Sequence, residues 1–401
     1  MGPLFLRPAY KGESMRDRMR FCVPCLFGVE GLVAQELREM ELEEVQAENG
    51  RVLFSGGWEA MVRANLNSRF GERVLLLLGE FPARSFEELF QGVKALPWED
   101  LLKREDQFPV TGSSLSSQLH SVPDCQAIVK KAIVERLKAK YRLSWFPETG
   151  SLHRVRFRIL KDRVSVMVDT SGEGLHKRGY RAQSNEAPIK ETLAASLCQL
   201  SRLRPDGHLI DPFCGSGTLL VEGALLALRI APGLQRSFTA QAWENVPQSL
   251  WRQERDRARA QERRETGFSA QGFDIDPAAV ELTLENARKA GVEEYISASV
   301  RDIRAFSQEG RYGCVICNPP YGERLLDVRQ AQQLYQSMGS LFRPQRGWSF
   351  GIITPDPEFE ALFGRKADKR RKLYNGMIQC QYYQYFRGEE KGRDAAPTAP
   401  R

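Results

Sequence analysis

Asp211-Pro212-Phe213-Cys214-Gly215-Ser216-Gly217-Thr218 stands near the middle of this 401-residue chain and decides its fold. The stretch follows a short apolar run, His208-Leu209-Ile210, and precedes an apolar segment over 219–228. This order predicts a buried strand, a glycine turn and a helix. Two glycines in such a turn let the backbone approach a ligand at the carboxyl end of the strand, where open α/β sheets bind cofactors.

Three later segments repeat the order of a strand followed by a polar side chain. The second strand ends in Asp274-Ile275-Asp276-Pro277 before a predicted helix over 278–290, and the third ends in Asp302-Ile303. The fourth, 314–317, runs directly into Asn318-Pro319-Pro320-Tyr321. The pattern predicts an α/β domain with a Rossmann-like, doubly wound parallel sheet. A carboxylate at the tip of the second strand suits the two hydroxyls of a ribose.

The Asn-Pro-Pro-Tyr motif fits the chemistry of an amino group on a nucleobase. Such an amine is a poor nucleophile because its lone pair is delocalised into the ring, so positioning matters more than a strong base. The Asn318 side-chain oxygen and the Pro319 carbonyl can both accept hydrogen bonds from the amine. Pro319 and Pro320 would hold these acceptors in an extended turn, and Tyr321 would stack on a base swung out of its helix.

Together the two motifs resemble S-adenosylmethionine-dependent methyltransferases that act on exocyclic amines. The segments Leu175-His176-Lys177-Arg178-Gly179-Tyr180-Arg181 and 187–195 resemble the joint before the catalytic domain of the THUMP-domain guanine-N2 RNA methyltransferases. Within that family the likeness is to bacterial enzymes of the 23S ribosomal RNA type, over residues 21–386. It implies S-adenosylmethionine as the cofactor and guanosine N2 as the methyl acceptor.

The candidate site residues follow from the motifs and the resemblance. The catalytic candidates are Asn318, Pro319, Pro320 and Tyr321. The cofactor candidates are Thr192, Asp211, Phe213, Cys214, Gly215, Ser216, Gly217, Thr218, Asp274, Ile275, Asp302, Ile303 and Asn318.

Basic side chains gather in a few places, although the net charge is only +7. A predicted basic helix over 126–141, a strand with alternating arginines over 154–158 and the joint supply the candidate RNA contacts: Lys130, Lys131, Lys138, Arg154, Arg156, Arg178 and Arg181. A third cluster lies within 365–372. Such patches suit a phosphate backbone, but charge runs also form ordinary solvated faces.

The cysteines and the apolar runs argue against other classes of protein. Two Cys-x-x-Cys pairs, Cys22 with Cys25 and Cys314 with Cys317, could hold zinc, but the second pair lies in a predicted buried strand where packing needs only small apolar residues. We therefore expect reduced thiols and no metal. Cys214 as a nucleophile is a further alternative. Neither a membrane span nor a signal peptide is found, which predicts a cytoplasmic protein.

The expected organisation places an RNA-binding region before the methyltransferase domain. Trp58 should begin a helix-rich stretch, 245–266 should form a solvent-exposed helix with ion pairs or an RNA contact, and 377–386 should form the edge strand of the sheet. The expected divisions are a disordered leader (1–20), a ferredoxin-like part (21–60), a THUMP domain (61–171), a joint (172–190), the methyltransferase domain (191–387) and a disordered tail (388–401).

Three functions remain compatible with these motifs. The first is a guanine-N2 methyltransferase acting on 23S ribosomal RNA. The second is an adenine-N6 methyltransferase of DNA or RNA, or a guanine-N2 enzyme acting on transfer RNA, because the exocyclic amines are chemically alike. The third is a non-catalytic RNA-binding factor for ribosome assembly, which the complete set of motif residues disfavours.

Overall fold

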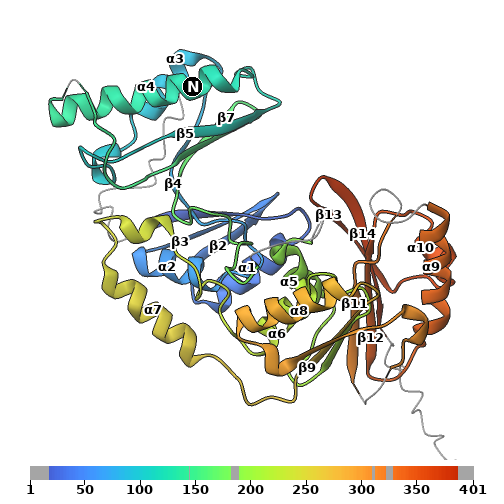
Figure 1. Cartoon of the computed structure of the whole chain (residues 1–401). Coiled ribbons are helices and arrows are strands. Elements are labelled where there is room, and N and C mark those ends of the chain that lie inside the picture. The colour runs from blue at the N-terminus through green and yellow to red at the C-terminus, as the bar shows by residue number, and fades with distance from the viewer. Residues whose placement is uncertain (1–17, 144, 182–188, 309–311, 322–327, 387–401) are drawn as a thin grey trace, which may run out of the picture. The chain divides into compact units, whose positions relative to one another are not determined.

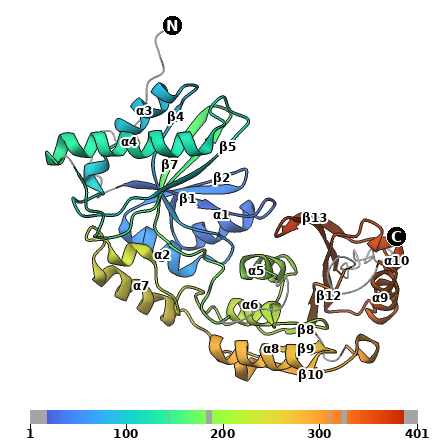
Figure 2. The same ribbon diagram turned by 45° about the horizontal axis from the view of Figure 1, so that its top comes forward.

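The computed structural model of the chain divides into two compact units, each with one seven-stranded sheet (Figure 1, Figure 2). The first unit comprises Met1–Arg178 and Ala231–Glu262, and the second comprises Gly179–Ile230 and Arg263–Arg401. The predicted disordered tail and nearly all of the predicted leader lie outside the described residues, which are 18–143, 145–181, 189–308, 312–321 and 328–386.

A single sheet in the order β2-β3-β1-β4-β7-β6-β5 runs through the first unit. Strand β4 joins its two halves, because it pairs with β1 at one end and with β7 along most of its length. The elements in chain order are β1 (Met19–Pro24), α1 (Glu30–Glu39), β2 (Glu43–Glu48), β3 (Arg51–Gly56), α2 (Trp58–Asn67), β4 (Leu75–Pro82), α3 (Phe86–Lys94), β5 (Val110–Leu115), α4 (Val122–Tyr141), β6 (Val155–Leu160), β7 (Arg163–Asp169) and α7 (Gln248–Ala260).

The expected helix-rich stretch after Trp58 was only partly correct. Helix α2 is present, but the four leucines that follow, 75–78, lie in strand β4 and are all buried. A strand that is buried on both faces loses the alternation that identifies strands in a sequence, and so it resembles a buried helix. The predicted strand with alternating arginines is β6, which forms a hairpin with β7 and carries Arg156 and Arg158 on its less buried face.

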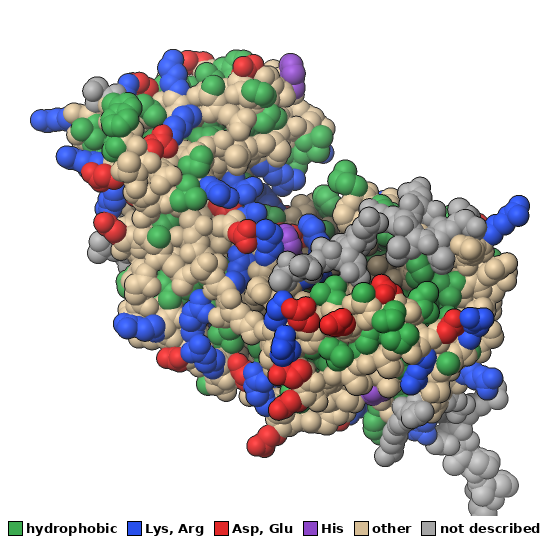
Figure 3. All heavy atoms as spheres, in the orientation of Figure 1, with side chains coloured by type: hydrophobic (Ala, Val, Ile, Leu, Met, Phe, Trp, Pro, Cys, Tyr) green, Lys and Arg blue, Asp and Glu red, His purple; other side chains and the backbone are tan. Residues whose placement is uncertain are grey.

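The segment Ala231–Glu262, which lies in the sequence between α6 and β9 of the second unit, belongs to the first unit. Helix α7 packs on α2, with Trp251 stacked on Phe238 at 5.2 Å between ring centroids and Glu254 buried. Trp243 stacks on His153 and donates a hydrogen bond to the carbonyl of Leu152. The outer surface of α7 carries charges of both signs, as expected of a solvent-exposed helix (Figure 3). One face of the predicted exposed helix is therefore part of a core.

We expect Glu254→Ala to destabilise the first unit by about 1–3 kcal/mol, because the partly buried guanidinium of Arg63 loses its carboxylate partner and keeps only the carbonyl of Met40. Arg63 donates two hydrogen bonds to this carboxylate, at 2.9 and 2.8 Å. Chemical unfolding followed by tryptophan fluorescence would measure the loss. Asp256→Ala is the matched control, since Asp256 lies on the same helix with 74% of its side chain exposed. Equal effects of the two substitutions would contradict the role assigned to the buried pair.

The second unit has the predicted doubly wound sheet. Strands β10, β9, β8, β11 and β12 are parallel in that spatial order, and β14 and β13 continue the sheet antiparallel. Its elements are α5 (Glu191–Leu200), β8 (His208–Asp211), α6 (Thr218–Ala227), β9 (Ser269–Asp274), α8 (Pro277–Ala290), β10 (Ile296–Val300), β11 (Gly313–Cys317), α9 (Val328–Leu341), β12 (Trp348–Thr354), α10 (Phe359–Phe363), β13 (Lys369–Asn375) and β14 (Ile378–Phe386).

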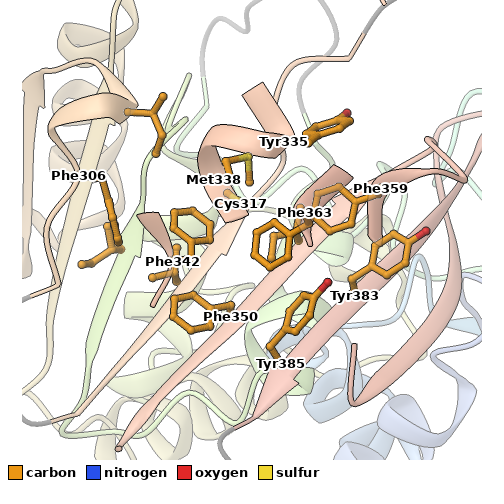
Figure 4. Close-up of a cluster of buried hydrophobic side chains, with 14 of the residues drawn as sticks. Phe306, Cys317, Tyr335, Met338, Phe342, Phe350, Phe359, Phe363, Tyr383 and Tyr385 are labelled. Atoms are coloured by element: carbon orange, nitrogen blue, oxygen red, sulfur yellow. The ribbon is translucent and has the colours of Figure 1, made fainter. Parts of the chain in front are cut away.

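Helices cover both faces of this sheet. Helices α5, α6 and α8 lie on one face, and α9 and α10 lie on the other (Figure 1). The second face is packed with aromatic rings: Phe342 stacks on Phe350, and Phe359 contacts Tyr383 (Figure 4). Helix α8 begins one residue before its predicted start and ends at the predicted residue. Asp276 accepts a hydrogen bond from the Ala278 amide at its start, and Gly291 has a left-handed φ of 68° at its end.

The prediction that the last strand lies at the sheet edge was wrong. Strand β14 pairs with β12 on one side and with β13 on the other, so β13 is the edge strand. This strand was not predicted, because its residues 369–372 belong to the third basic cluster of the sequence and lack the apolar pattern of a strand. Lys and Arg are common on edge strands because their charges prevent pairing with another sheet.

Candidate active site

The motif residues meet at one edge of the second sheet. Strands β8, β9 and β11 end at Asp211, Asp274 and Cys317, and their parallel register places all three carboxyl ends together. Strand order reverses between β8 and β11, because the chain builds outward from β8 to β9 and β10 before it returns to place β11 on the other side. Such a switch point is where doubly wound sheets bind ligands.

The glycine loop between β8 and α6 is fixed by side chains from α8. Thr283 Oγ1 donates to the carbonyl of Gly215 at 2.9 Å, and Asn286 Nδ2 donates to the carbonyl of Ser216 at 2.9 Å. Gly217 has φ 73°, and a Cβ there would lie 2.8 Å from Thr283. By contrast, a Cβ on Gly215 would meet no atom within 4 Å, so the backbone borders open space there. Thr283 and Asn286 were not among the predicted site residues, although both are polar and lie three apart on a buried helical face.

Asp274 links the loop to the end of the second strand. Its Oδ2 accepts a hydrogen bond from the Gly215 amide at 3.0 Å, and its Oδ1 accepts one from the Asp276 amide at 3.0 Å. Each carboxylate oxygen has two acceptor positions, so both oxygens keep one position for a further donor. Two neighbouring acceptors beside an open glycine turn fit the two hydroxyls of a ribose.

Asp211 and Cys214 are the buried ionisable groups of the loop. Burial raises the pKa of Asp211 to about 8, and the nearby Asp274 carboxylate adds to the effect. This shift favours the neutral carboxyl group, and Oδ1 of Asp211 accepts a hydrogen bond from the Phe213 amide at 3.1 Å. Burial also raises the pKa of Cys214 to about 12. A thiol that stays protonated does not support the alternative in which Cys214 is a nucleophile.

The predicted cofactor residues beyond the loop occupy different environments. Ile275 is 72% exposed directly after Asp274, which leaves its side chain available to cover an aromatic ring. Ile303 lies in the core instead. Asp302 is half exposed and pairs with Arg304 at 2.7 Å, and this hydrogen-bonded pair holds the pKa of Asp302 at about 2. Thr192 is buried in the first turn of α5.

Asn318 offers an unused hydrogen-bond acceptor at this point of the site. Its side-chain oxygen, Oδ1, is buried and accepts no hydrogen bond from the described residues. An unsatisfied buried acceptor costs about 1–3 kcal/mol, so it is rarely kept unless a ligand satisfies it. The residue follows β11 immediately, at the switch point described above, and Pro319 beside it is also buried.

Tyr321 is held by a residue of the edge strand β13. Its ring is mostly buried, and its hydroxyl accepts a hydrogen bond from Asn375 Nδ2 at 3.3 Å. Asn375 is the last residue of the edge strand β13, so a contact joins this strand to the Asn-Pro-Pro-Tyr motif. The sequence analysis did not identify Asn375, because an Asn-Gly pair predicts a hairpin turn and nothing more. The Gly-Glu-Arg that follows Tyr321 lies outside the described residues.

The joint residues Tyr180 and Arg181 are tied to the helices of the second unit. Tyr180 donates to Glu222 on α6 at 3.0 Å. Arg181 donates to Thr218 Oγ1 and to the carbonyl of Ile189, and it lies 3.5 Å from the Glu191 carboxylate. Arg181 therefore braces the end of the glycine loop.

The other basic residues proposed to contact RNA lie in the first unit. Lys131 and Arg154 are exposed, whereas Lys130, Lys138 and Arg156 are paired with Glu148, Glu135 and Asp169 at 2.6, 3.2 and 3.0 Å. Arg178 is 3% exposed and donates to the carbonyls of Arg69 and Leu175. An RNA contact by Arg178 would require these bonds to open.

All eight cysteines are free thiols, and the two Cys-x-x-Cys pairs lie on strands or at a strand end. Cys314 and Cys317, three apart on β11, point to opposite faces of the sheet. Burial raises the pKa of Cys314 to about 11. Among the described residues, no group of three or more His, Cys, Asp or Glu side chains is arranged to hold a metal ion. None of the helices formed by these residues is both long and apolar enough to cross a membrane.

Three protein-family models together match nearly the whole described chain. Residues 178–384 match an RMKL-like methyltransferase domain, residues 20–75 an RlmL ferredoxin-like domain, and residues 83–169 a THUMP domain. YpsC of Bacillus subtilis, whose name assigns it provisionally as an RNA methyltransferase, is 42% identical over 90% of this chain and 94% of its own. The chain belongs to the RMKL-like methyltransferase family.

A second curated relative is longer. Ribosomal RNA large subunit methyltransferase K/L of Psychromonas ingrahamii is 34% identical over 96% of this chain, but the match spans only 52% of that protein. The chain thus spans about half the length of this relative.

Two solved structures share the fold at similar identity. SMU.472, described provisionally as a methyltransferase and solved with SAH, is 42% identical with a TM-score of 0.88 and covers 94% of this chain and all of its own. A Listeria monocytogenes protein, described on prediction as an N6-adenine-specific DNA methylase, is 43% identical with a TM-score of 0.87, over 92% of this chain and 96% of its own. The cofactor of this enzyme is S-adenosylmethionine, and the open glycine turn, Asp274 and exposed Ile275 fit it.

Proposed function

We propose that this protein transfers a methyl group from S-adenosylmethionine to the exocyclic N2 of a guanosine in 23S ribosomal RNA. The observation that carries the proposal is the buried, unsatisfied Oδ1 of Asn318 at the switch point of the sheet. The cofactor supplies an electrophilic methyl group, and the chain's own residues bind and orient the amine that receives it.

In the proposed site, Asn318 Oδ1 and the Pro319 carbonyl each accept a hydrogen bond from one of the two N–H groups of the amine. Holding both hydrogens turns the nitrogen lone pair toward the methyl carbon and stabilises the positive charge that develops on nitrogen; the methylated nitrogen then releases one N–H proton to solvent. Tyr321 offers an aromatic face to the swung-out base. The protonated Cys214 thiol has no role as a nucleophile, so the transfer is direct.

RNA is supported as the polymer by the first unit and by the relatives. The THUMP match covers residues 83–169, and the Psychromonas relative is named as acting on large-subunit ribosomal RNA. Guanine is supported by the resemblance of the joint and the motifs. An adenine-N6 activity remains the second candidate, because the same two acceptors would orient that amine and the Listeria relative carries such a description.

We expect the purified protein to label ribosomal RNA from a strain that lacks the gene, with N2-methylguanosine as the product. Labelled S-adenosylmethionine and mass spectrometry of the digested nucleosides would identify both polymer and base. The matched control is RNA from the parent strain, whose sites are already methylated. Label found only in N6-methyladenine or only in transfer RNA would overturn the assignment. A loss of methyl transfer in Asn318→Ala would exclude a purely non-catalytic assembly factor.

A further inference from the structure

The hairpin formed by β13 and β14 has a short and well-defined tip. Asn375 pairs with Ile378, so the loop contains only Gly376 and Met377. Gly376 has φ 65°, a conformation that two-residue hairpin loops require and that glycine adopts without strain. The pairing continues without a break from Asn375 back to Lys369. The tip is therefore held by a regular ladder of backbone hydrogen bonds.

This tip projects beyond the edge of the sheet that carries the site. Strand β14 runs antiparallel to β12, and their pairing ends at Thr354 with Gln381. Three residues of β14, 378–380, continue past the carboxyl end of β12, which at 3.4 Å per residue is about 10 Å. The carboxyl end of β12 lies at the same edge as that of β11, because the two strands are parallel in register. The hydrogen bond from Asn375 to Tyr321 confirms that the hairpin reaches the catalytic motif.

Met377 at the tip is 96% exposed. Single exposed apolar residues are common on protein surfaces, so its exposure alone argues nothing. Its position in the chain is more informative, because it lies two residues after Asn375, whose side chain contacts the hydroxyl of Tyr321, the ring proposed to receive a base. Methionine is unbranched and polarisable, so its side chain packs readily against flat rings.

The strand that leads to this tip is strongly basic. Lys369, Arg370, Arg371 and Lys372 are consecutive and exposed on the edge strand. Arg370 is bound to Glu360, and the Lys372 ammonium lies 5.6 Å from the centre of the Tyr374 ring. Charge on an edge strand also prevents sheet pairing, but that purpose does not require an apolar side chain at the tip. The exposed cations lie on both faces of the strand that leads to the exposed apolar tip, and this arrangement fits a nucleic-acid strand, with phosphates along β13 and bases at the tip.

We propose that Met377 is a wedge that enters the base stack of the RNA and takes the place of the nucleotide that is swung into the site. Swinging a base out of a helix costs a few kcal/mol of stacking and pairing, and an inserted apolar side chain recovers part of that cost. The basic run of β13 holds the phosphates of the same RNA. Asn375 links the wedge to Tyr321, so insertion and capture of the base occur at one rigid element. This inference rests on the proposed RNA methyl transfer.

The kinetic test compares three substitutions on protein-free large-subunit ribosomal RNA from a strain that lacks the gene. Met377→Ala is expected to lower kcat/KM for RNA by about 10-fold or more, since a wedge supplies part of the unstacking cost. Met377→Leu keeps most of the side-chain volume and should restore most of that loss. Leu284→Ala is the matched control, because Leu284 is an exposed apolar residue of α8 away from the hairpin. Calorimetry should give the same Kd for S-adenosylmethionine in all three. Equal kcat/KM for Met377→Ala and the parent would overturn the wedge.

The basic run of β13 is tested separately, by the affinity for RNA and its dependence on salt concentration. Lys369→Ala combined with Lys372→Ala should weaken RNA binding and lower the magnitude of the slope of log K against log salt by about 1.8, at ~0.9 per lost phosphate contact on a double helix. An unchanged slope would remove β13 from the RNA surface.

Photo-crosslinking separates this inference from the proposed function. Benzoylphenylalanine in place of Met377 is expected to crosslink the same RNA, and in place of Leu284 it is not. Crosslinking at 377 without methyl transfer by the parent protein would overturn the proposed function and keep the hairpin as an RNA contact. Methyl transfer by the parent with no crosslink at 377 would overturn the hairpin proposal alone. If benzoylphenylalanine at position 377 crosslinks only to protein and never to RNA, the hairpin proposal is also overturned.

Discussion

Asn318→Ala is expected to lower kcat for methyl transfer by about 10²- to 10³-fold, the usual effect of removing one preorganised polar group from a reacting centre. The substitution removes the buried Oδ1 that is proposed to orient the amine. It removes nothing from the glycine loop, so the Kd for S-adenosylmethionine should stay within about threefold of the parent. Single-turnover kinetics with ribosomal RNA and calorimetry with the cofactor would measure the two quantities separately.

Asn318→Asp is the conservative control for this experiment. It keeps an acceptor oxygen at the same distance from the backbone and should retain more activity than Asn318→Ala. If the alanine variant instead loses cofactor affinity and kcat is unaffected, the residue belongs to the cofactor site and the proposed division of roles fails.

Asp274→Ala is expected to raise the Kd for S-adenosylmethionine by about 10²- to 10⁴-fold, because it removes two charge-assisted hydrogen bonds of about 1.5–3 kcal/mol each. It also frees the Gly215 amide that Asp274 now holds at 3.0 Å. Saturating cofactor should recover much of the turnover, since Asp274 does not contact the amine in the proposed site. Calorimetry and the dependence of rate on cofactor concentration would test both parts.

Asp276→Ala is the matched control for Asp274→Ala. Asp276 is a carboxylate two residues away whose side chain caps α8 by accepting from the Ala278 amide at 2.9 Å. Its loss should cost about 1 kcal/mol of stability and leave the cofactor Kd nearly unchanged. A similar rise in Kd for both variants would mean that local charge, and not the hydrogen-bond geometry of Asp274, governs affinity.

The sequence predicted the second unit better than the first. In the second unit, strands end in polar residues and helices have clear caps, so local chemistry marks each boundary. In the first unit the four leucines of β4 are buried on both faces, and their pattern does not distinguish a strand from a helix. The partners of a strand such as β13 are also non-local, and only the register with β14 reveals that it forms the edge.

The motif residues could be predicted because cofactor loops impose glycines and acids at fixed positions. The residues that hold these motif residues in place could not be predicted. Thr283, Asn286 and Asn375 act through contacts between residues 54 to 70 positions apart, and their own local sequence fits an ordinary helix or turn. The basic residues showed the opposite problem: charge could be counted in the sequence, but the pairing of Lys130 with Glu148 and the burial of Arg178 required the fold.

The path of the chain through α7 has a consequence for biosynthesis. The first unit includes Ala231–Glu262, so its core around Trp243 and Trp251 cannot close when Arg178 has emerged from the ribosome. Closure must wait for Glu262, some seconds later at ~5–20 residues per second. By then β8 and α6 of the second unit have already been made. The two units therefore cannot fold strictly one after the other, and deleting residues up to 178 would leave two tryptophans without the surface they pack against.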